Sequence, residues 1–377
     1  RFRVLCAKCN NAAWRKTFKQ RYRLGRPVTD NPLCEFLTES GLVIPSERWI
    51  ALRDSTDKEV LIDWFSDLAK SGRMPFMPVI SESEAASDFL ALFQWTPQWT
   101  SQSIPKTRSG LYASGRFSNT ARAGAYLNSL EMTGNELWSG VDETALRRIL
   151  RMLYVWGANE GVSTINWHRY MTLGGGLPHQ FKPAVAKALY ERFCPKGGRV
   201  LDCCAGWGDR LLGFYASDHP AEYVGVDPNE AMVGAYQAQA AFCSKFVANK
   251  RSRTLCLPIE DVKDLKGLGP FDMAFTSPPY FNTERYVNSP TQSWRRYPTI
   301  GEWVSGFLRP FIELQVGCVN GPILVNVAKS LKTDLPKLVT SVAGTFGLRL
   351  EQTLDMGISN RNGGGERNEP VLVFVKG

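Results

Sequence analysis

The chain has 377 residues, enough for two domains, with 44% hydrophobic residues and a formal net charge of +9, a composition typical of globular proteins. It contains no run of eighteen apolar residues and no signal peptide, so we expect neither a membrane-spanning nor a secreted protein. Its nine cysteines are scattered without a disulfide-type framework, which predicts a reducing compartment: the cytoplasm, or the nucleoid or host cytoplasm if the chain is viral.

The charge is concentrated at the N-terminus. Residues 1–26 contain nine basic residues and no acidic one, so they alone carry a charge equal to that of the whole chain. Aromatic residues lie among them, as in segments that bind nucleic-acid phosphates, although a solvated basic tail without a partner fits the same composition. The candidate phosphate contacts of this basic arm, residues 1–30, are Arg15, Lys16, Lys19, Arg21 and Arg23.

Two cysteines of the arm, Cys6 and Cys9, have the spacing of half a zinc site. A second ligand pair is hard to find, because Cys34 is single and the three histidines lie far along the chain. Half a site is weak support, so we predict no metal and keep a structural zinc as the alternative.

Residues 31–165 are predicted to form a mixed, mostly helical accessory domain that binds nucleic acid. Apolar residues recur at helical spacing over 58–71 and 143–157, and the run MPFMP at 74–78 interrupts the pattern.

One stretch of this domain, residues 89–130, contains no acidic residue. Basic and aromatic side chains lie there among Gly, Ser and Thr, as a flexible loop contacting nucleic acid requires. An ordinary polar loop with buried tryptophans fits about as well. The candidate nucleic-acid contacts of the stretch are Lys106, Arg108 and Arg116.

The run VLDCCAGWG at 200–208 predicts a strand, a glycine turn and a helix. Asp202 follows the strand end, and Gly206 and Gly208 allow the backbone to turn tightly and approach a ligand closely. Residues 210–215 then have a helical pattern.

A second apolar strand over 223–226 ends at Asp227, nineteen residues after Gly208. An acidic group at this position can accept hydrogen bonds from both ribose hydroxyls of a nucleoside cofactor. The run PIEDV at 258–262 places polar groups where a third strand should end.

The run TSPPY at 276–280 follows another buried-strand pattern, residues 271–275. Together with the glycine turn about seventy residues upstream, it resembles the motifs of amino-methyltransferases of the (D/N/S)PPY family. These enzymes transfer a methyl group from S-adenosylmethionine to an exocyclic amine of adenine or cytosine in DNA, and many belong to phages or restriction–modification systems.

The resemblance implies an α/β fold, a doubly wound Rossmann-like methyltransferase sheet over residues 166–377. It also covers the run GGGLPHQFKP at 174–183 and apolar strands at 323–327 and 369–376. The cofactor contacts that it implies are Phe181, Lys182, Pro183, Asp202, Ala205, Gly206, Trp207, Gly208, Asp227, Pro228, Glu260, Asp261 and Thr276.

The implied catalytic residues are Ser277, Pro278, Pro279 and Tyr280. The Ser277 hydroxyl and a carbonyl of the rigid Pro-Pro unit can accept hydrogen bonds from the target amine, whose lone pair is otherwise delocalised into the ring. Tyr280 offers an aromatic face to a base extruded from its stack. Carbon-5 methylation would instead need a Pro-Cys nucleophile, and the chain has no such dipeptide.

A Thr-Ser-Pro-Pro-Tyr loop resembles the cytosine-N4 group, whereas Asp or Asn before the prolines is commoner in adenine-N6 enzymes. We therefore expect cytosine N4 ahead of adenine N6. Residues 281–299 are expected to line the target-base pocket, with Arg285, Arg295 and Arg296 as nucleic-acid contacts. The alternatives are methylation of RNA or of a protein amide, or a cofactor-binding scaffold without turnover.

Overall fold

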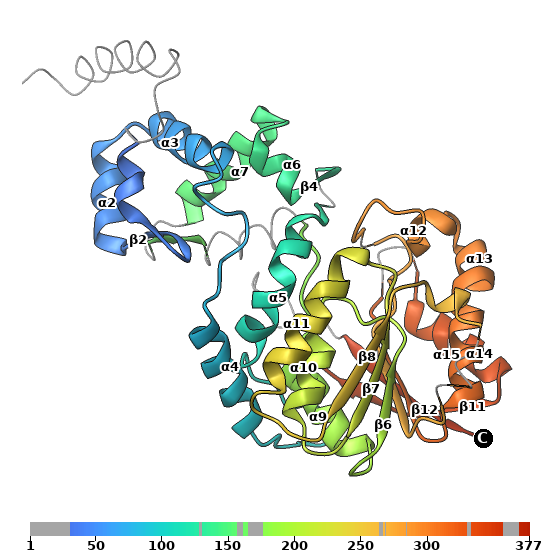
Figure 1. Ribbon diagram of the computed structural model, residues 1–377. Helices are drawn as coiled ribbons and strands as arrows, with labels where there is room; N and C mark the ends of the chain where they lie inside the picture. The colour runs from blue at the N-terminus through green and yellow to red at the C-terminus, as the bar shows by residue number, and fades with distance from the viewer. Residues whose placement is uncertain are drawn as a thin grey trace, which may run out of the picture. The chain divides into compact units, whose positions relative to one another are not determined.

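The computed structural model describes residues 31–127, 130–156, 161–164, 176–263, 267, 269–283, 285–329, 333–356 and 369–377. The basic arm, with its five candidate phosphate contacts and with Cys6 and Cys9, lies outside these residues, so the predictions made for it stay predictions. The chain divides into two compact units, Arg1–Val79 with Ser129–Leu177, and Ile80–Asn128 with Pro178–Gly377 (Figure 1).

The first unit is mostly helical, with one small antiparallel sheet of order β1-β2-β5. Its elements are η2 (Pro32–Phe36), β1 (Leu37–Thr38), β2 (Gly41–Ile44), α2 (Ser46–Ser55), α3 (Lys58–Lys70), β4 (Met132–Thr133), α6 (Gly134–Ser139), α7 (Glu143–Trp156) and β5 (Val162–Ser163). Helix α3 begins at Asp57, whose side chain accepts a hydrogen bond from the Glu59 backbone, and it buries Trp64 and Phe65. The helices predicted over 58–71 and 143–157 are confirmed.

The described residues of this unit are acidic overall. They contain twelve Asp or Glu and eight Lys or Arg, a formal charge of −4. Several of the basic side chains are also paired internally: Arg147 and Arg151 both contact Glu59, and Arg147 also contacts Asp63. The nucleic-acid-binding role expected of residues 31–165 therefore draws no support from the charge of this part.

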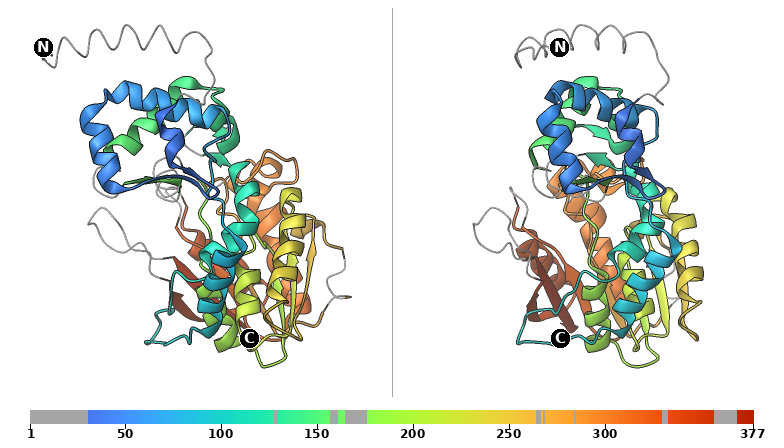
Figure 2. Two further views of the ribbon diagram at one scale, coloured as in Figure 1. Left: turned by 60° about the vertical axis from the view of Figure 1, so that its left-hand side comes forward. Right: turned by 90° about the vertical axis from the view of Figure 1, so that its left-hand side faces the viewer.

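The second unit contains a seven-stranded sheet of order β11-β12-β10-β9-β6-β7-β8. Strand β12 runs in the opposite direction to the other six strands. The strands are β6 (Arg199–Asp202), β7 (Glu222–Val226), β8 (Arg251–Leu255), β9 (Met273–Thr276), β10 (Ile323–Asn326), β11 (Leu348–Asp355) and β12 (Pro370–Lys376). Figure 2 shows β11 and β12, in red, at the edge opposite β8.

Helices cover both faces of this sheet (Figure 1). On one face lie α9 (Pro183–Phe193), α10 (Asp209–Ala216) and α11 (Val233–Cys243), joined by α4 (Glu82–Gln94) and α5 (Leu111–Ala123). On the other face lie α13 (Ile300–Trp303), η6 (Val304–Leu308), α14 (Arg309–Cys318) and α15 (Leu335–Thr345). Their buried aromatic residues, Trp303, Phe307 and Phe311, pack with strand residues in one core. The predicted doubly wound, Rossmann-like sheet is confirmed.

The division into units differs from the expected boundary at residues 165 and 166, because residues 80–128 belong to the second unit. Helices α4 and α5 pack against α10 and α11. The flexible loop expected at 89–130 is wrong over α5, where small residues such as Ala113 and Gly115 allow close helix packing. Arg122, another basic residue of that stretch, is 1% exposed and donates hydrogen bonds to Asn119 and Gln180.

No helix in the described parts of the chain combines the length and apolar character needed to cross a bilayer.

Close approach of α9 and α10 makes Gly213 a test of the packing. A methyl group there would lie 2.6 Å from the Pro183 carbonyl oxygen and 2.7 Å from the Ala186 Cβ. The steric conflict in Gly213→Ala should cost about 1–3 kcal/mol. The better helix propensity of alanine returns roughly 1 kcal/mol of this, so we expect a net decrease in the free energy of unfolding. Chemical denaturation measures this, with Gly234→Ala in α11, where nothing lies within 4 Å, as the control that should not destabilise. Equal stability of both variants would contradict the packing.

Candidate active site

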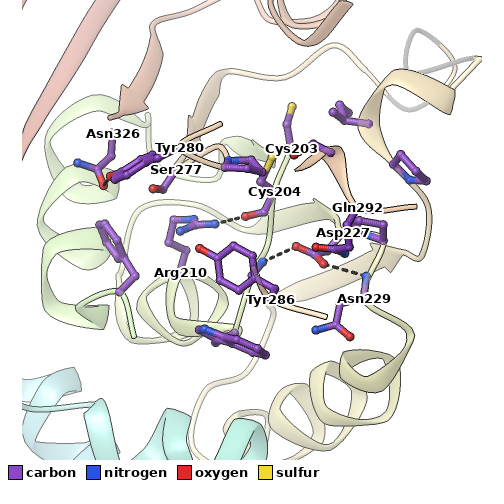
Figure 3. Close-up of a pocket in the computed structure, with 18 of the residues that line it drawn as sticks. Cys203, Cys204, Arg210, Asp227, Asn229, Ser277, Tyr280, Tyr286, Gln292 and Asn326 are labelled. Carbon is purple, nitrogen blue, oxygen red and sulfur yellow. Dashed lines mark hydrogen bonds between the residues drawn. The ribbon is translucent and has the colours of Figure 1, made fainter. Parts of the chain in front are cut away.

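A cavity lies at the carboxyl ends of β6, β7, β9 and β10, where the strand order reverses (Figure 3). This edge is where ligands bind in doubly wound sheets. About 1040 Å³ of space lies among the lining residues, and part of it is open to solvent. Its lining residues are His179, Gln180, Phe181, Cys203, Cys204, Gly206, Trp207, Asp209, Arg210, Asp227, Pro228, Asn229, Pro258, Ile259, Glu260, Ser277, Pro279, Tyr280, Tyr286, Thr291, Gln292, Ser293, Phe307, Asn326 and Glu369.

The glycine turn connects β6 to α10, as the sequence predicts. Gly206 and Gly208 have φ angles of +60° and +81°, a backbone region that disfavours side chains. At Gly208 a Cβ would also lie 2.6 Å from the Gln239 Oε1 atom, whereas nothing lies within 3.4 Å of such an atom at Gly206. Gly206 and Trp207 line the cavity, while Ala205 and Gly208 shape the turn behind them.

Asp202 has a different place from the one predicted, because its carboxylate is fully buried and does not line the cavity. It accepts hydrogen bonds from Arg210 Nε at 2.8 Å and from the Tyr223 hydroxyl at 2.7 Å. Burial is the largest single effect on the pKa of Arg210 and lowers it, but the charge and hydrogen bonds of Asp202, together with Tyr223 and Tyr190, outweigh burial and hold that pKa above its ordinary value. Arg210 does line the cavity, and it also donates to the Cys204 carbonyl.

Asp227 lies at the end of β7 and faces the cavity (Figure 3). Its two carboxylate oxygens accept backbone hydrogen bonds from Gly206 at 2.8 Å and Asn229 at 3.0 Å. Burial raises the pKa of Asp227 to about 6, and the two backbone donors oppose this shift. The carboxylate is therefore fixed in direction and ionised at neutral pH.

The acidic turn η5 (Ile259–Asp261) follows β8. Glu260 lines the cavity, and its Oε1 atom lies 2.9 Å from Arg296 and 3.2 Å from the Tyr297 hydroxyl. Asp261 does not line the cavity; it pairs with Arg296 at 3.0 Å. Burial raises the pKa of Glu260, and the Arg296 charge works against that rise.

The predicted catalytic loop follows β9 and reaches the same cavity. Ser277, Pro279 and Tyr280 line it, while Pro278 and the fully buried Thr276 do not. The Tyr280 hydroxyl donates to Asn326 Oδ1 at 3.3 Å (Figure 3).

Asn326 and Phe281 both hold the C-terminal end of this loop. Asn326, at the end of β10, donates through Nδ2 to the Pro370 carbonyl at 3.1 Å, so its amide is fixed. Phe281 has a φ of +56°, which is unusual for a bulky residue, and its ring lies 6.1 Å from that of Trp303. Such backbone conformations cluster at functional sites.

The segment before α9 is anchored to α10 through Asp209. The Asp209 carboxylate accepts from Gln180 Nε2 at 3.2 Å and from the Phe181 backbone at 3.0 Å. Phe181 lines the cavity as predicted, whereas Lys182 and Pro183 begin helix α9 outside its wall.

The segment after Tyr280 lies against the cavity, as expected for residues 281–299. Four of its residues line the wall: Tyr286, Thr291, Gln292 and Ser293. The Tyr286 ring makes an edge contact with Trp207 at 5.5 Å, so this segment also contacts the glycine turn. Arg285 and Arg295 lie over the ring of Trp294, at 5.2 Å and 5.5 Å from its centre.

The remaining candidate nucleic-acid contacts lie away from the cavity wall. Lys106 donates to the Met356 carbonyl at 3.0 Å, and Arg116 donates to the Ile80 carbonyl. Arg108 is exposed. Of the three arginines expected after Tyr280, Arg296 is committed to Glu260 and Asp261 rather than presented to solvent.

Sequence reasoning missed several polar residues of the site. Asp209, Arg210, Asn229 and Asn326 all line the cavity, yet none stands in a recognisable motif. The signal for them was position: Asp209 and Arg210 follow the glycine turn, Asn229 follows the strand predicted at 223–226, and Asn326 lies near the end of the strand predicted at 323–327. Gln292 lay inside a segment that we expected at the pocket, but nothing singled it out.

No family model and no curated protein sequence matches this chain. Solved structures do align with part of it. A methyltransferase from Pyrococcus furiosus aligns over 52% of this chain and 84% of its own, at 16% identity with a TM-score of 0.36. The precorrin-6y C5,15-methyltransferase of Geobacter metallireducens GS-15 aligns over 52% of this chain and 86% of its own, at 12% identity with a TM-score of 0.33. Magnesium protoporphyrin IX methyltransferase from Synechocystis PCC 6803, with bound SAM, aligns over 48% of this chain and 71% of its own, at 15% identity with a TM-score of 0.33.

The buried pair of Asp202 and Arg210 predicts a large stability effect. Arg210→Met should lower the free energy of unfolding by about 3–5 kcal/mol, because it leaves a buried carboxylate without its counter-charge. Denaturant titration of the variant measures this. Lys329→Met is the control, since Lys329 and Asp334 are 73% and 41% exposed and their pair at 2.9 Å is screened by water. A stability equal to that of the control would contradict the importance of the pair.

Proposed function

We propose that this protein transfers a methyl group from S-adenosylmethionine to an exocyclic amine of a base in DNA, with cytosine N4 favoured over adenine N6. The observation that carries the proposal is that one cavity brings together two predicted sites. Ser277 and Tyr280, the groups suited to a base amine, share it with Asp227 and Gly206, the groups suited to a nucleoside cofactor.

The cavity residues fit S-adenosylmethionine. Asp227 presents a carboxylate whose direction is fixed by two backbone donors, as an acceptor for two ribose hydroxyls must be. Glu260 offers an acceptor suited to an adenine amine on the next turn along the sheet. Trp207 lines the wall, and its indole N–H is buried without a hydrogen-bond partner among the described residues.

Bound here, S-adenosylmethionine would supply a methyl group on a positively charged sulfur. The Ser277 hydroxyl and a carbonyl of the Pro-Pro unit would accept hydrogen bonds from the target amine and direct its lone pair for one in-line displacement. Tyr280, held through Asn326, would stack on the extruded base. The proton lost from the amine would pass to solvent.

The residues near the cavity support a nucleic-acid substrate. Arg285 and Arg295 flank one indole, Trp294, and present two positive charges beside the wall formed by Tyr286 and Gln292. Arginine side chains of this kind bind phosphate oxygens, and the aromatic ring suits an unpaired base. DNA is the proposed partner because of the resemblance of the Thr-Ser-Pro-Pro-Tyr loop, which also favours cytosine.

The decisive experiment is incubation with labelled S-adenosylmethionine and either DNA or RNA, followed by digestion and mass identification of the methylated nucleoside. N4-methylcytosine from DNA is the expected product. N6-methyladenine would change the base but keep the enzyme class, and methylated RNA would replace the proposed partner. Absence of transfer to any nucleic acid, by protein that binds the cofactor, would contradict the function.

Ser277→Ala tests the role of the loop. We expect it to reduce turnover by about two to three orders of magnitude, because a positioned acceptor is lost, while cofactor affinity stays near that of the wild type. Turnover measured with saturating cofactor and calorimetry of cofactor binding separate the two effects. Ser305→Ala, at an exposed position of η6, is the matched control and should be fully active. Wild-type turnover in Ser277→Ala would sink the assignment of this loop.

Asp227 predicts how cofactor affinity depends on pH. Its pKa is raised to about 6, and only the ionised carboxylate can accept both ribose hydroxyls. Affinity should therefore be constant well above pH 6 and fall progressively as the pH drops from 7 to 5. Asp227→Asn should bind the cofactor weakly and lose most of this dependence. An unchanged affinity across this range in the wild type would show that Asp227 does not contact the cofactor.

A further inference from the structure

Two adjacent arginines of α12 (Ser293–Arg296) have different surroundings. Arg295 is exposed and contacts Trp294 and Asn288. Arg296 instead reaches the acidic turn after β8, with one nitrogen 2.9 Å from Glu260 and both terminal nitrogens 3.0 Å from Asp261. A side chain engaged by two carboxylates is poorly placed to bind a phosphate.

Glu260 depends on this contact. Its side chain is 6% exposed, so its charge has lost most of its hydration. The groups that face it are Arg296, the Tyr297 hydroxyl, the Asp261 carboxylate and the Cys204 thiol. Arg296 is the positively charged group among them. The Cys204 thiol and the Tyr297 hydroxyl stay neutral, because burial holds the pKa of Cys204 well above its ordinary value and raises that of Tyr297 to about 12.

The same arginine also ends the segment that lines the other side of the cavity. Tyr286, Gln292 and Ser293 precede it along the chain and form part of the wall near the catalytic loop. Tyr297, which follows it, packs its ring against Gly306, where a Cβ would lie 2.2 Å from that ring. The backbone at Arg296 is thus positioned by the packing of the neighbouring Tyr297, and its side chain by the two carboxylates of the acidic turn.

We infer that Arg296 is a positioning residue of the cofactor site: it holds the Glu260 carboxylate charged and directed into the cavity, and it is not a nucleic-acid contact. The inference rests on the proposed function, because Glu260 is the acceptor assigned there to the adenine amine. It gives the two neighbouring arginines separate tasks, Arg295 toward phosphate and Arg296 toward the cofactor.

The test compares Arg296→Met with Arg295→Met in the full-length protein. Calorimetry with S-adenosylmethionine should give Arg296→Met a Kd roughly tenfold to a hundredfold higher, because a hydrogen-bonded counter-charge is removed. Arg295→Met should bind the cofactor as the wild type does. A salt titration of duplex DNA binding should show the reverse: a shallower slope only in Arg295→Met.

A pH series adds a readout that loss of packing alone would not produce. Asp227, whose pKa is about 6, is already ionised between pH 7 and 9. Its titration should therefore not change the cofactor affinity of the wild type in that range. In Arg296→Met the loss of the positive charge should raise the pKa of Glu260 further, so affinity should depend on pH over a higher range than in the wild type. Arg296→Lys keeps one positive charge and should recover part of the affinity. Tyr297→Phe, which removes one hydrogen bond to Glu260 and keeps the ring, should weaken binding severalfold and serves if Arg296→Met does not fold.

The outcomes separate the two proposals. A wild-type protein that fails to bind S-adenosylmethionine would overturn the proposed function. Wild-type binding with an unchanged Kd in Arg296→Met and Tyr297→Phe would overturn only the role of Arg296. A shallower salt slope in Arg296→Met with unchanged cofactor affinity would make it the phosphate contact that the sequence predicted.

Discussion

The buried ion pair between Asp202 and Arg210 is the constraint on which the site depends. Burying two charges is unfavourable unless each is fully satisfied, and here the Tyr223 hydroxyl and the backbone of the turn complete the hydrogen bonding. The pair connects the last residue of β6 to the second residue of α10, so it fixes the turn between them. Asp227 is then hydrogen-bonded to that turn at Gly206. One buried contact thus determines where two strand ends present their polar groups.

From this turn the cavity is assembled by contacts between neighbouring segments. Asp209, the first residue of α10, anchors the backbone of Phe181, and Trp207 contacts Tyr286 from the segment after the catalytic loop. On the far side, Asn326 joins Tyr280 to the Pro370 carbonyl on the only antiparallel strand of the sheet. Asp227, Glu260 and Asn326 are thus each held by a contact to another element, an arrangement that fixes polar groups before a ligand arrives.

Much of the second unit could be predicted from sequence because its strands are short apolar runs followed at once by polar residues. The runs ending at Asp202, Asp227 and Thr276 identified β6, β7 and β9. The direction of a single carboxylate could not be predicted in the same way, since Asp202 and Asp227 have the same local setting and only the fold turns one inward. Helix α5 was not predicted because its small and polar residues are typical of loops; in the structure they pack against α4, α10 and α11.

The segment between Phe281 and Tyr297 is fastened at both ends, by the contact of Phe281 with Trp303 and by the hold of Arg296 and Tyr297 on the acidic turn. The exposed residues between these anchors can therefore be exchanged without disturbing the sheet, whereas Tyr286 and the buried Gln292 and Ser293 are part of the cavity wall. Such a layout lets substrate choice diverge among descendants of one scaffold while the chemistry is retained. For protein engineering, this segment is a suitable target for mutagenesis, provided that the two anchoring ends are left unchanged.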